Sequence, residues 1–335
     1  MYLVSWLLSA KLGASSEMEY FIIMNLCAGG NNGQKIWPQI KEQLKAAHAS
    51  YQVVFTEYTG HAVLLTQQLL SRIDATHVTD AVIIAAGGDG TLHETLLGCK
   101  RYYHDHASDQ QVPIAFLPVG SGNDFARAVK LPRHWQQALN NILACKQATM
   151  INVGHYIDLD NQIDGFFTNN FGIGFDATVV HLANHSSLKH HRFWGKFSYI
   201  ASILNVIINF KSFQADIQLD SNQQLTFKKT FLLTTTNIPY FGGGIDIVPD
   251  ASVLDPNLDL VIVEKPSLWQ LILFISMLFL KRHLRLKFIH HFNQKQLVVH
   301  TQDDRLGQID GEELGERTYH IKFDTVKYPF WIGHN

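Results

Sequence analysis

The sequence predicts an α/β protein of two domains: an N-terminal α/β domain built on a parallel sheet, then a mostly antiparallel β domain. In the first half, short apolar runs alternate with segments of helical apolar spacing, which favours a parallel sheet covered on both faces. Near residue 149 the pattern changes to strand-like segments with fewer helices between them, which favours antiparallel pairing. A length of 335 residues and a hydrophobic content of 46% allow two domains and a substantial core.

One stretch of the first domain, Ala81–Glu94, organises this interpretation. Val82–Ala86 is apolar and rich in β-branched residues, as expected of a strand buried on both faces. Three glycines follow it at once and permit backbone conformations that a Cβ would forbid, namely Gly87, Gly88 and Gly90. Thr91 and Glu94 have the spacing of a capping box, so a helix is expected to begin at Thr91.

Further elements of the first domain repeat this alternation. Strands are expected at Tyr20–Met24, Val53–Phe55 and Ile114–Leu117, and helices at Gln34–Ala47 and Ala62–Ile73. Glycine-containing turns follow the first and the last of these strands. Because parallel strands end at one edge of the sheet, these turns are expected together at the edge where such sheets bind ligands.

The second half contains seven expected strands and two expected helices. The strands are Ile151–Ile157, Gly165–Phe171, Phe213–Leu219, Leu225–Thr235, Leu258–Val263, Gln296–His300 and Thr318–Phe323. The helices are Phe193–Phe210 and Ser267–Arg282. The expected domains are therefore 18–148 and 149–323, and the last segment, 324–335, could return to the first domain.

The first seventeen residues contain an apolar run that is too short to cross a bilayer and has no positive segment before it. Met18 opens the first expected strand, so residues 1–17 are interpreted as a non-native or disordered extension. Net charge is −2, which gives no indication of nucleic-acid binding. The three cysteines are far apart in sequence and are expected to be reduced thiols of a cytoplasmic protein.

The glycine turns point to phosphate chemistry. A strand, a glycine turn and a helix start present free N–H groups to an anion. Asp89 lies within such a turn, and a carboxylate beside phosphate is favourable only with a cation between them, so Mg²⁺ is expected. The simpler alternative is an ordinary turn with Asp89 at the surface. The sequence contains neither a Walker A motif nor a protein-kinase glycine loop.

Two late carboxylates, Asp310 and Glu312, are candidates for a general base, and Gly311 between them allows a tight bend. Two acidic groups this close would titrate together, so one of them is expected to have a raised pKa. The alternative is an acidic hairpin tip, because Asp-Gly is a common hairpin signal.

Three motifs, taken together, carry a family resemblance: GGDGTLHE at 87–94, PVGSGNDFARA at 118–128 and IDGEE at 309–313. The ensemble resembles the diacylglycerol kinase catalytic-domain family, in particular bacterial soluble lipid kinases that include relatives of sphingosine kinases. The resemblance implies a nucleotide domain like that of phosphofructokinases and NAD kinases, a C-terminal β-sandwich, and an active site in the cleft between the domains. It also implies ATP-dependent phosphorylation of a lipid hydroxyl, with diacylglycerol as the expected acceptor and phosphatidic acid as product.

The same resemblance implies roles for individual residues. Glu312 matches the proton acceptor, Asp310 is implicated beside it, and Asp89 and Asp124 match acidic positions around phosphate and metal. The positions that match nucleotide contacts are Asn25, Leu26, Cys27, Ala28, Gly29, Thr56, Gly88, Asp89, Gly90, Thr91, Leu92, His93, Glu94 and Ser121. Two other functions stay open: an NAD kinase-like enzyme, because GGDGT is shared with NAD kinases, and a non-catalytic nucleotide- or lipid-binding regulator.

A second metal site is implied by the family loop A-x-x-x-D-G-x-L-D, which here reads ASVLDPNLD at 251–259. Asp255 would supply a side-chain ligand for a structural Mg²⁺, and Ser252 and Asn257 would supply carbonyl ligands. Pro256 replaces the usual glycine and restricts the loop, so a plain turn is the alternative.

Membrane contact is expected to be peripheral, because no segment is long enough to span a bilayer. Leu268–Leu280 is strongly apolar and a basic stretch follows it, so it is either an interfacial helix or a core helix of the second domain. We therefore expect a cytoplasmic protein that associates transiently with membranes. The identity of the lipid stays open, and so does a homodimer.

Overall fold

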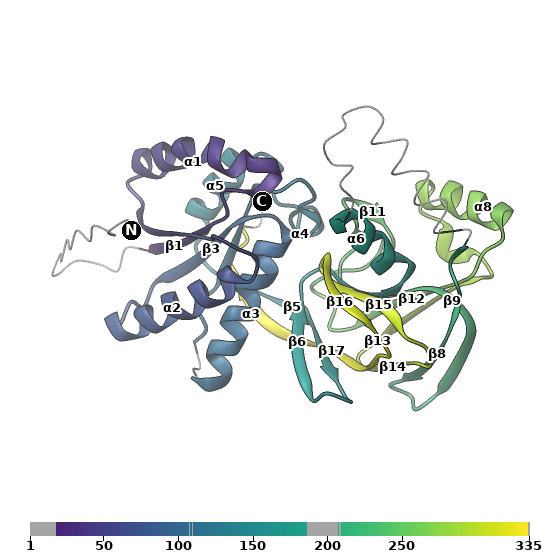
Figure 1. The fold of residues 1–335 in the computed structure, drawn as a ribbon. Coiled ribbons are helices and arrows are strands. Elements are labelled where there is room, and N and C mark those ends of the chain that lie inside the picture. Colours follow the sequence, from purple (N-terminus) through teal and green to yellow (C-terminus); the bar gives the residue numbers. More distant parts are fainter. Residues whose placement is uncertain (1–17, 107, 109, 186–206, 208, 334–335) are drawn as a thin grey trace.

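The computed structural model describes residues 18–106, 108, 110–185, 207 and 209–333. It shows two lobes, with the N-terminal half of the chain on the left of Figure 1 and the later strands on the right. Residues 1–17 and most of the predicted helix Phe193–Phe210 lie outside the described residues.

The first lobe is a parallel sheet with helices on both faces. Its strands are β1 (Glu19–Met24), β2 (Ser50–Phe55), β3 (Ala81–Gly87) and β4 (Ile114–Pro118), in the spatial order β2-β1-β3-β4. Its helices are α1 (Ala28–Ala46), α2 (His61–Thr76), α3 (Asp89–Asp105), α4 (Asp124–Ala128) and α5 (Trp135–Ala144).

Alternate residues of the central strands pack on opposite faces of this sheet. Phe21 and Ile23 of β1 pack with apolar residues of α2 and α3, whereas Ile22 and Met24 pack with those of α1 and α5. The two helix pairs lie on opposite sides of the sheet in Figure 1. Burial of both strand faces explains why Val82–Ala86 reads as a continuous apolar run.

The second lobe is mostly antiparallel. Its strands are β5 (Thr149–Asp158), β6 (Ile163–Phe167), β7 (Asn170–Gly174), β8 (Phe213–Leu219), β9 (Gln224–Thr236), β10 (Tyr240–Phe241), β11 (Ile245–Asp246), β12 (Leu258–Glu264), β13 (Ile289–Gln294), β14 (Leu297–Thr301), β15 (Arg305–Ile309), β16 (Glu312–Arg317) and β17 (His320–Phe330). It also contains α6 (Phe175–His185), α8 (Leu268–Phe279) and the 3₁₀ turn η2 (His283–Arg285). The predicted α/β-plus-antiparallel fold class is confirmed.

One long strand joins the lobes. β17 pairs antiparallel with β14 and β5, and its last residue, Phe330, pairs parallel with Ile114 of β4. Tyr328, Phe330 and Trp331 are buried in the first lobe. The strand predicted to end at Phe323 therefore continues for seven further residues, because its apolar end fills the edge of the parallel sheet.

The predicted strand Gly165–Phe171 is wrong as a single element. It divides into β6 and β7 at Thr168 and Asn169, whose amides donate to the Asp310 carboxylate at 2.7 and 2.8 Å instead of joining the sheet. A buried side chain from a distant part of the sequence thus interrupts an otherwise regular strand pattern. Strands β10, β11, β13, β15 and β16 were not predicted from the sequence.

Candidate active site

Three turns of the first lobe meet at the carboxyl ends of β1, β3 and β4. A Cβ on Gly120 would lie 2.5 Å from the Cα of Gly88, so the last two turns can approach this closely only with glycine at that position. Gly29 has a φ of +63°, and a Cβ there would lie 2.7 Å from the carbonyl oxygen of Val119. The glycines allow main-chain groups of three turns to gather at one place.

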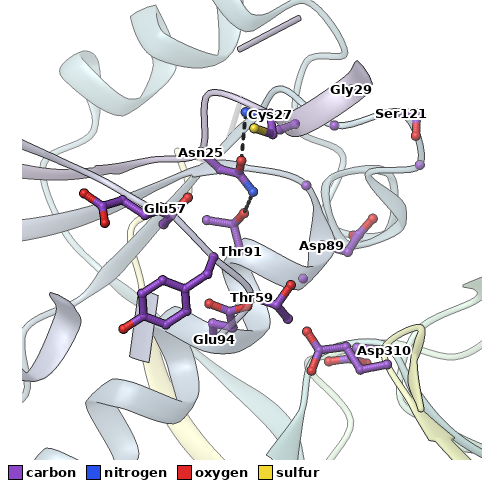
Figure 2. A pocket seen from close by; sticks show the side chains of 18 residues that line it. Asn25, Cys27, Gly29, Glu57, Thr59, Asp89, Thr91, Glu94, Ser121 and Asp310 are labelled. Carbon is purple, nitrogen blue, oxygen red and sulfur yellow. Dashed lines mark hydrogen bonds between the residues drawn. The ribbon is translucent and has the colours of Figure 1, made fainter. Parts of the chain in front are cut away.

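These turns enclose a polar pocket with a volume of about 590 Å³, shown in Figure 2. Asp310 and Glu312 of the second lobe complete its wall, so the pocket lies between the lobes. The residues that line it are Asn25, Cys27, Ala28, Gly29, Thr56, Glu57, Tyr58, Thr59, Gly88, Asp89, Gly90, Thr91, Glu94, Gly120, Ser121, Gly122, Asp310 and Glu312.

Asn25 fixes the first turn to the second. Its side-chain amide donates to the Thr91 hydroxyl at 3.2 Å, and its side-chain oxygen accepts from the Cys27 amide at 3.0 Å. Both bonds are drawn in Figure 2. These two hydrogen bonds hold the shape of the turn that follows β1, and residues of that turn line the pocket.

The predicted capping box is wrong. Helix α3 begins at Asp89, with Gly88 as its N-cap, so Thr91 lies inside the first turn of the helix. The Glu94 carboxylate instead accepts hydrogen bonds from the amides of Gly60, at 2.7 Å, and Ala62, at 3.0 Å. These amides are at the start of α2, where orphan N–H groups need acceptors, so Glu94 caps a neighbouring helix.

The Asp89 carboxylate faces the start of α4. It accepts hydrogen bonds from the amides of Phe125, at 3.0 Å, and Asp124, at 3.2 Å. Burial raises the pKa of Asp89, and the Phe125 hydrogen bond opposes that rise. A cation beside this carboxylate would compensate the desolvation, so the residue fits a role next to Mg²⁺ and phosphate.

The Asp310 carboxylate is saturated with hydrogen bonds. The His93 ring donates to it at 2.8 Å, and so do the hydroxyl of Thr168 and three consecutive amides, those of Thr168, Asn169 and Asn170. Burial alone would raise the pKa of Asp310, but these donors hold it below its ordinary value. Burial would likewise lower the pKa of His93, but the Asp310 partner raises it. The pair fixes the β15–β16 turn to α3.

Glu312 differs from Asp310, two residues earlier. It is half-buried in the polar pocket, and among the described residues no hydrogen bond holds its carboxylate. Its pKa is raised, chiefly by burial, with Glu94 and Asp310 adding repulsion and His93 opposing the rise. Of the two candidates, Glu312 is therefore the one whose carboxylate is free to accept a proton.

Asp124 lies on the other side of the α4 turn. One carboxylate oxygen pairs with Arg127, and the other accepts the Gly243 amide at 2.8 Å. Gly243 belongs to the turn between β10 and β11, so Asp124 connects this loop of the second lobe to the first. In this arrangement its oxygens hold protein groups and it does not line the polar pocket.

A second pocket, of about 500 Å³, lies next to the first and is mainly apolar. Asp89, Gly122 and Asp310 line both cavities, so the two meet at these residues. The apolar pocket extends to the inner face of α8. Its apolar side chains are Phe175, Val179, Val180, Phe231, Leu232, Phe241, Ile245, Ile247, Val263, Leu271, Phe274 and Leu278.

One buried acid, Asp176 of α6, lies in the wall of this apolar pocket. Burial raises its pKa to about 6, and Gln308 donates to one of its oxygens at 3.2 Å. The other oxygen, Oδ1, is buried and accepts no hydrogen bond from the residues that the structure describes. The residue offers a polar contact within a lipophilic cavity.

Most of the positions expected to contact nucleotide line the polar pocket, and three do not. Leu26 is not part of the lining, Leu92 is in the hydrophobic core, and His93 is bound to Asp310. Every residue from 88 to 94 was predicted to contact nucleotide. In a helix only some residues of the first turn can face a ligand, and the others face the protein interior. Five lining residues were not predicted: Glu57, Tyr58, Thr59, Gly120 and Gly122. The two glycines lie inside a recognised motif, but nothing in the local sequence marks Glu57–Thr59.

The loop expected to hold a structural Mg²⁺ forms hydrogen bonds within itself. The Ser252 carbonyl accepts the Asp255 amide at 2.9 Å, and an Asp255 carboxylate oxygen accepts the Asn257 amide at 2.9 Å. The Pro256 carbonyl accepts the Thr325 hydroxyl at 2.7 Å. The donor set contains a single carboxylate, and two of its oxygens, the Ser252 carbonyl and Asp255 Oδ1, already accept hydrogen bonds. Metal binding at this loop stays a prediction.

Helix α8 is mainly exposed. The Ser267 and Gln270 side chains form a capping box at its start, and among its own residues only Leu271 is buried. Its other large apolar side chains are exposed in part or nearly in full, including Trp269 at 81% and Phe279 at 85%. A core helix, one of the two readings from sequence, is therefore excluded. Within the described ranges no helix has the length and apolarity needed to cross a membrane.

Each lobe matches a known protein domain. Residues 19–156 match the diacylglycerol kinase catalytic domain, and residues 170–325 match the YegS C-terminal NAD kinase beta sandwich-like domain. The chain is similar to a diacylglycerol kinase of Bacillus subtilis, at 28% identity over 72% of this chain and 77% of that protein. It is also similar to a diacylglycerol kinase of Staphylococcus saprophyticus, at 26% identity over 88% and 89%.

A solved structure shares the fold. A diacylglycerol kinase from Bacillus anthracis superposes with a TM-score of 0.65 at 18% identity, covering 96% of this chain and 98% of that one. The two family matches cover consecutive parts of the chain and account for both lobes. The first lobe therefore belongs to the diacylglycerol kinase catalytic-domain family, and the chain is a lipid kinase-like enzyme.

Proposed function

We propose that this enzyme transfers the γ-phosphate of ATP to a lipid hydroxyl, with diacylglycerol as the acceptor and phosphatidic acid as the product. The observation that carries the proposal is the junction of the two cavities. A polar pocket surrounded by glycine turns meets an apolar pocket at Asp89, Gly122 and Asp310. A phosphate donor in the first and an acyl glycerol in the second would bring their reacting groups together there.

The polar pocket suits a nucleotide triphosphate. Three turns offer main-chain amides without side-chain obstruction, and α3 starts within the pocket, where its dipole favours negative charge. Asp89 would hold Mg²⁺, which, when bound, neutralises charge on the β- and γ-phosphates. In this proposal the Asp124 carboxylate acts by holding the Gly243 loop in place.

Glu312 is assigned as the general base. The lipid hydroxyl oxygen forms a bond to the γ-phosphorus, the bond from that phosphorus to the departing ADP oxygen breaks, and the hydroxyl proton passes to Glu312. Asp310 is a positioning residue, because its hydrogen bonds fix the turn on which Glu312 lies. A base of this kind contributes roughly 10²–10⁴ in rate.

Helix α8 is assigned to peripheral membrane contact. Its inner side chains Leu271, Phe274 and Leu278 line the apolar pocket, while its outer apolar side chains face solvent. The exposed cations Arg282, Arg285 and Lys287 follow it in sequence. An apolar helix beside cations suits the surface of an anionic bilayer, and here it would put the pocket next to the lipid source.

The test is a transfer assay with labelled ATP and Mg²⁺, using diacylglycerol in mixed micelles as the acceptor and NAD as a second acceptor. We expect label in phosphatidic acid, none in NADP, and loss of transfer in Glu312→Gln. Label in NADP would favour an NAD kinase-like enzyme. Transfer to another lipid alcohol would revise the acceptor, and no transfer across a broad lipid panel would favour a non-catalytic regulator.

A further inference from the structure

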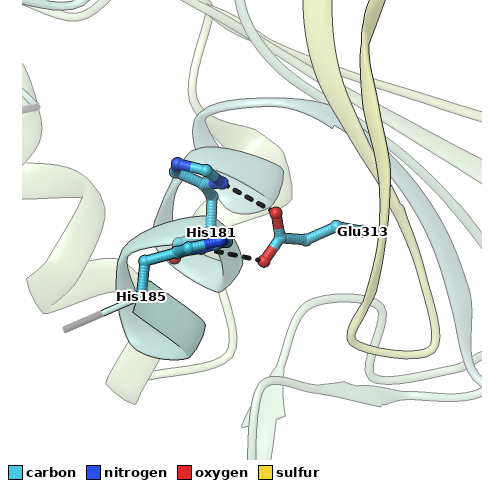
Figure 3. A group of neighbouring side chains, drawn as sticks. All are labelled: His181, His185 and Glu313. Atoms are coloured by element: carbon cyan, nitrogen blue, oxygen red, sulfur yellow. Dashed lines mark hydrogen bonds and ion pairs between the residues drawn. The ribbon is translucent and has the colours of Figure 1, made fainter. Parts of the chain in front are cut away.

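We propose that His181, His185 and Glu313 form a Zn²⁺ site that fastens helix α6 to strand β16. Figure 3 shows the two imidazoles on one face of α6 and the Glu313 carboxylate reaching them from β16. One ligand atom from each residue lies within 4.8 Å of the others. The site goes beyond the proposed kinase reaction and does not depend on it.

The sequence spacing places the two histidines together. Residues four apart lie one above the other on a helix, and the rings of His181 and His185 have centroids 4.2 Å apart. Two imidazoles and one carboxylate form a donor set that zinc commonly takes, with a fourth position for water or another ligand. The three side chains are partly exposed, so an ion could enter from solvent.

The hydrogen bonds already present orient the donor atoms. Glu313 Oε2 accepts from His181 Nδ1 at 2.7 Å, and Oε1 lies 3.4 Å from His185 Nδ1. Zinc bonds of about 2.0–2.2 Å in a tetrahedral site require ligand atoms roughly 3.3 Å apart. The two histidine–glutamate distances bracket this value, and the three ligand atoms, now within 4.8 Å of one another, would draw together by side-chain rotation. On metal binding, His185 Nδ1 would give up its present hydrogen bond to the His181 carbonyl, at 3.0 Å. The Asn184 side chain would give up its hydrogen bond to Glu313 Oε1 or share that oxygen with the ion.

The other histidine–carboxylate contacts of the described chain lack this arrangement. His290 pairs with Glu264 at 2.7 Å, and His320 with Asp160 at 3.0 Å, each with a single imidazole. Among the described residues, the trio on α6 and β16 is the group with the number and convergence of donors that a metal needs. His155 contacts two carboxylates, Asp324 at 2.6 Å and Asp164 at 3.8 Å, but it too is a single imidazole and its contacts involve opposite ring nitrogens.

The position gives the site a structural consequence. Successive side chains of a strand point to opposite faces, and Glu312 faces the polar pocket while Glu313 faces α6. Helix α6 also supplies Asp176, Val179 and Val180 to the apolar pocket. A bound ion would therefore fasten a wall of one cavity to the strand that carries a residue of the other.

The test is zinc uptake by the full, tag-free chain after chelator treatment, measured by competition with a chromophoric chelator in the absence of nucleotide and lipid. We expect the wild type to bind one Zn²⁺ per chain. The variants His181→Ala, His185→Ala and Glu313→Gln should each bind Zn²⁺ at least about tenfold more weakly. The matched control is His290→Ala, which removes another carboxylate-paired histidine and should bind as wild type. Circular dichroism checks that every variant is folded.

A second readout measures the fastening itself. Saturating Zn²⁺ should raise the Tm of the wild-type protein and slow amide exchange in β16, and should do neither in the double variant His181→Ala/His185→Ala. Absence of stoichiometric uptake by the wild type would overturn the proposal. So would equal uptake by the wild type and that double variant. Because no assay uses transfer activity, failure of the kinase proposal would leave these outcomes unchanged.

Discussion

The two cavities that meet at Asp89 are built from different parts of the chain. The polar pocket is bounded largely by main-chain turns, and a Cβ at Gly120 would clash with the Cα of Gly88 in the neighbouring turn. The apolar pocket is bounded by side chains of α6, α8 and several strands. Backbone amides recognise an anion whatever the neighbouring side chains are, whereas an apolar cavity has the shape that its side chains give it.

This difference predicts where substitutions should act. Changes at the polar pocket should affect the chemical step or the integrity of the turns. Changes at the apolar pocket and α8 should affect which lipid is used and how the enzyme reaches it. The four predictions below test that division, beginning with the largest expected effect.

Replacement of the proposed base should have the largest effect. Glu312→Gln keeps the shape of the side chain but cannot accept the proton, so kcat should fall by roughly 10²–10⁴, or about 3–5 kcal/mol of barrier. Because burial raises the Glu312 pKa, wild-type kcat should fall as pH drops through a value above the ordinary glutamate pKa. The pH–rate profile measures this, and Glu316→Gln, at an exposed position of the same strand, is the control. Wild-type turnover in Glu312→Gln would exclude the assigned role.

Removal of the buried charge at Asp310 should act on stability. Asp310→Asn breaks a pair whose side chains are 0% and 9% exposed, and it should reduce the free energy of unfolding by about 3 kcal/mol. Because the pKa of Asp310 is lower in the folded protein, this group stabilises the fold at pH values above its pKa in the unfolded chain. That stabilisation is lost as pH falls. Because the pKa of His93 is higher in the folded protein, this group stabilises the fold at pH values below its pKa in the unfolded chain. That stabilisation is lost as pH rises.

The pair should therefore stabilise most between about pH 4 and 6.5. Urea unfolding of wild type and Asp310→Asn across pH checks the window. The control is Asp303→Asn, at an exposed position. A stability difference that does not change with pH would mean that the pair contributes no linked protons.

A change inside the apolar pocket should alter lipid use rather than chemistry. Phe274→Ala removes a ring that lines the cavity, so KM for a long-chain acceptor should rise about tenfold while kcat for a short-chain acceptor stays near wild type. Assays with diacylglycerols of two chain lengths measure the split. A fall in kcat with KM unchanged would place Phe274 in the chemical step and contradict the division between the cavities.

The smallest effect is expected on the outer face of α8. Phe279→Ala removes an exposed ring, so binding to anionic vesicles should weaken by about threefold to tenfold and weaken further with salt. Leu254→Ala, at an exposed position on a loop outside α8, is the control. Vesicle sedimentation gives the affinities. Equal loss in both variants would remove α8 as the contact surface.

The sequence by itself determined the elements whose signals are local. Strand Val82–Ala86, the glycine turns that follow the strands, and the change near residue 149 are periodicity and backbone effects, which depend on neighbours in sequence. The same is true of α8, whose start the Ser267 capping box specifies. These features place the glycine turns and Asp89 at one sheet edge before any tertiary contact is known.

Only the tertiary structure decided which partners residues far apart in the sequence take. Glu94 has the spacing of a capping box in its own helix but caps α2, and Asp310 interrupts a strand pattern 142 residues away by taking the Thr168 amide. The exposure of α8 and the pairing of β17 with β4 likewise depend on what the rest of the chain covers. A local pattern states what a segment can form. Buried polar groups and apolar surfaces then take whichever partners the fold brings within reach, because leaving them unsatisfied costs more than departing from the local pattern.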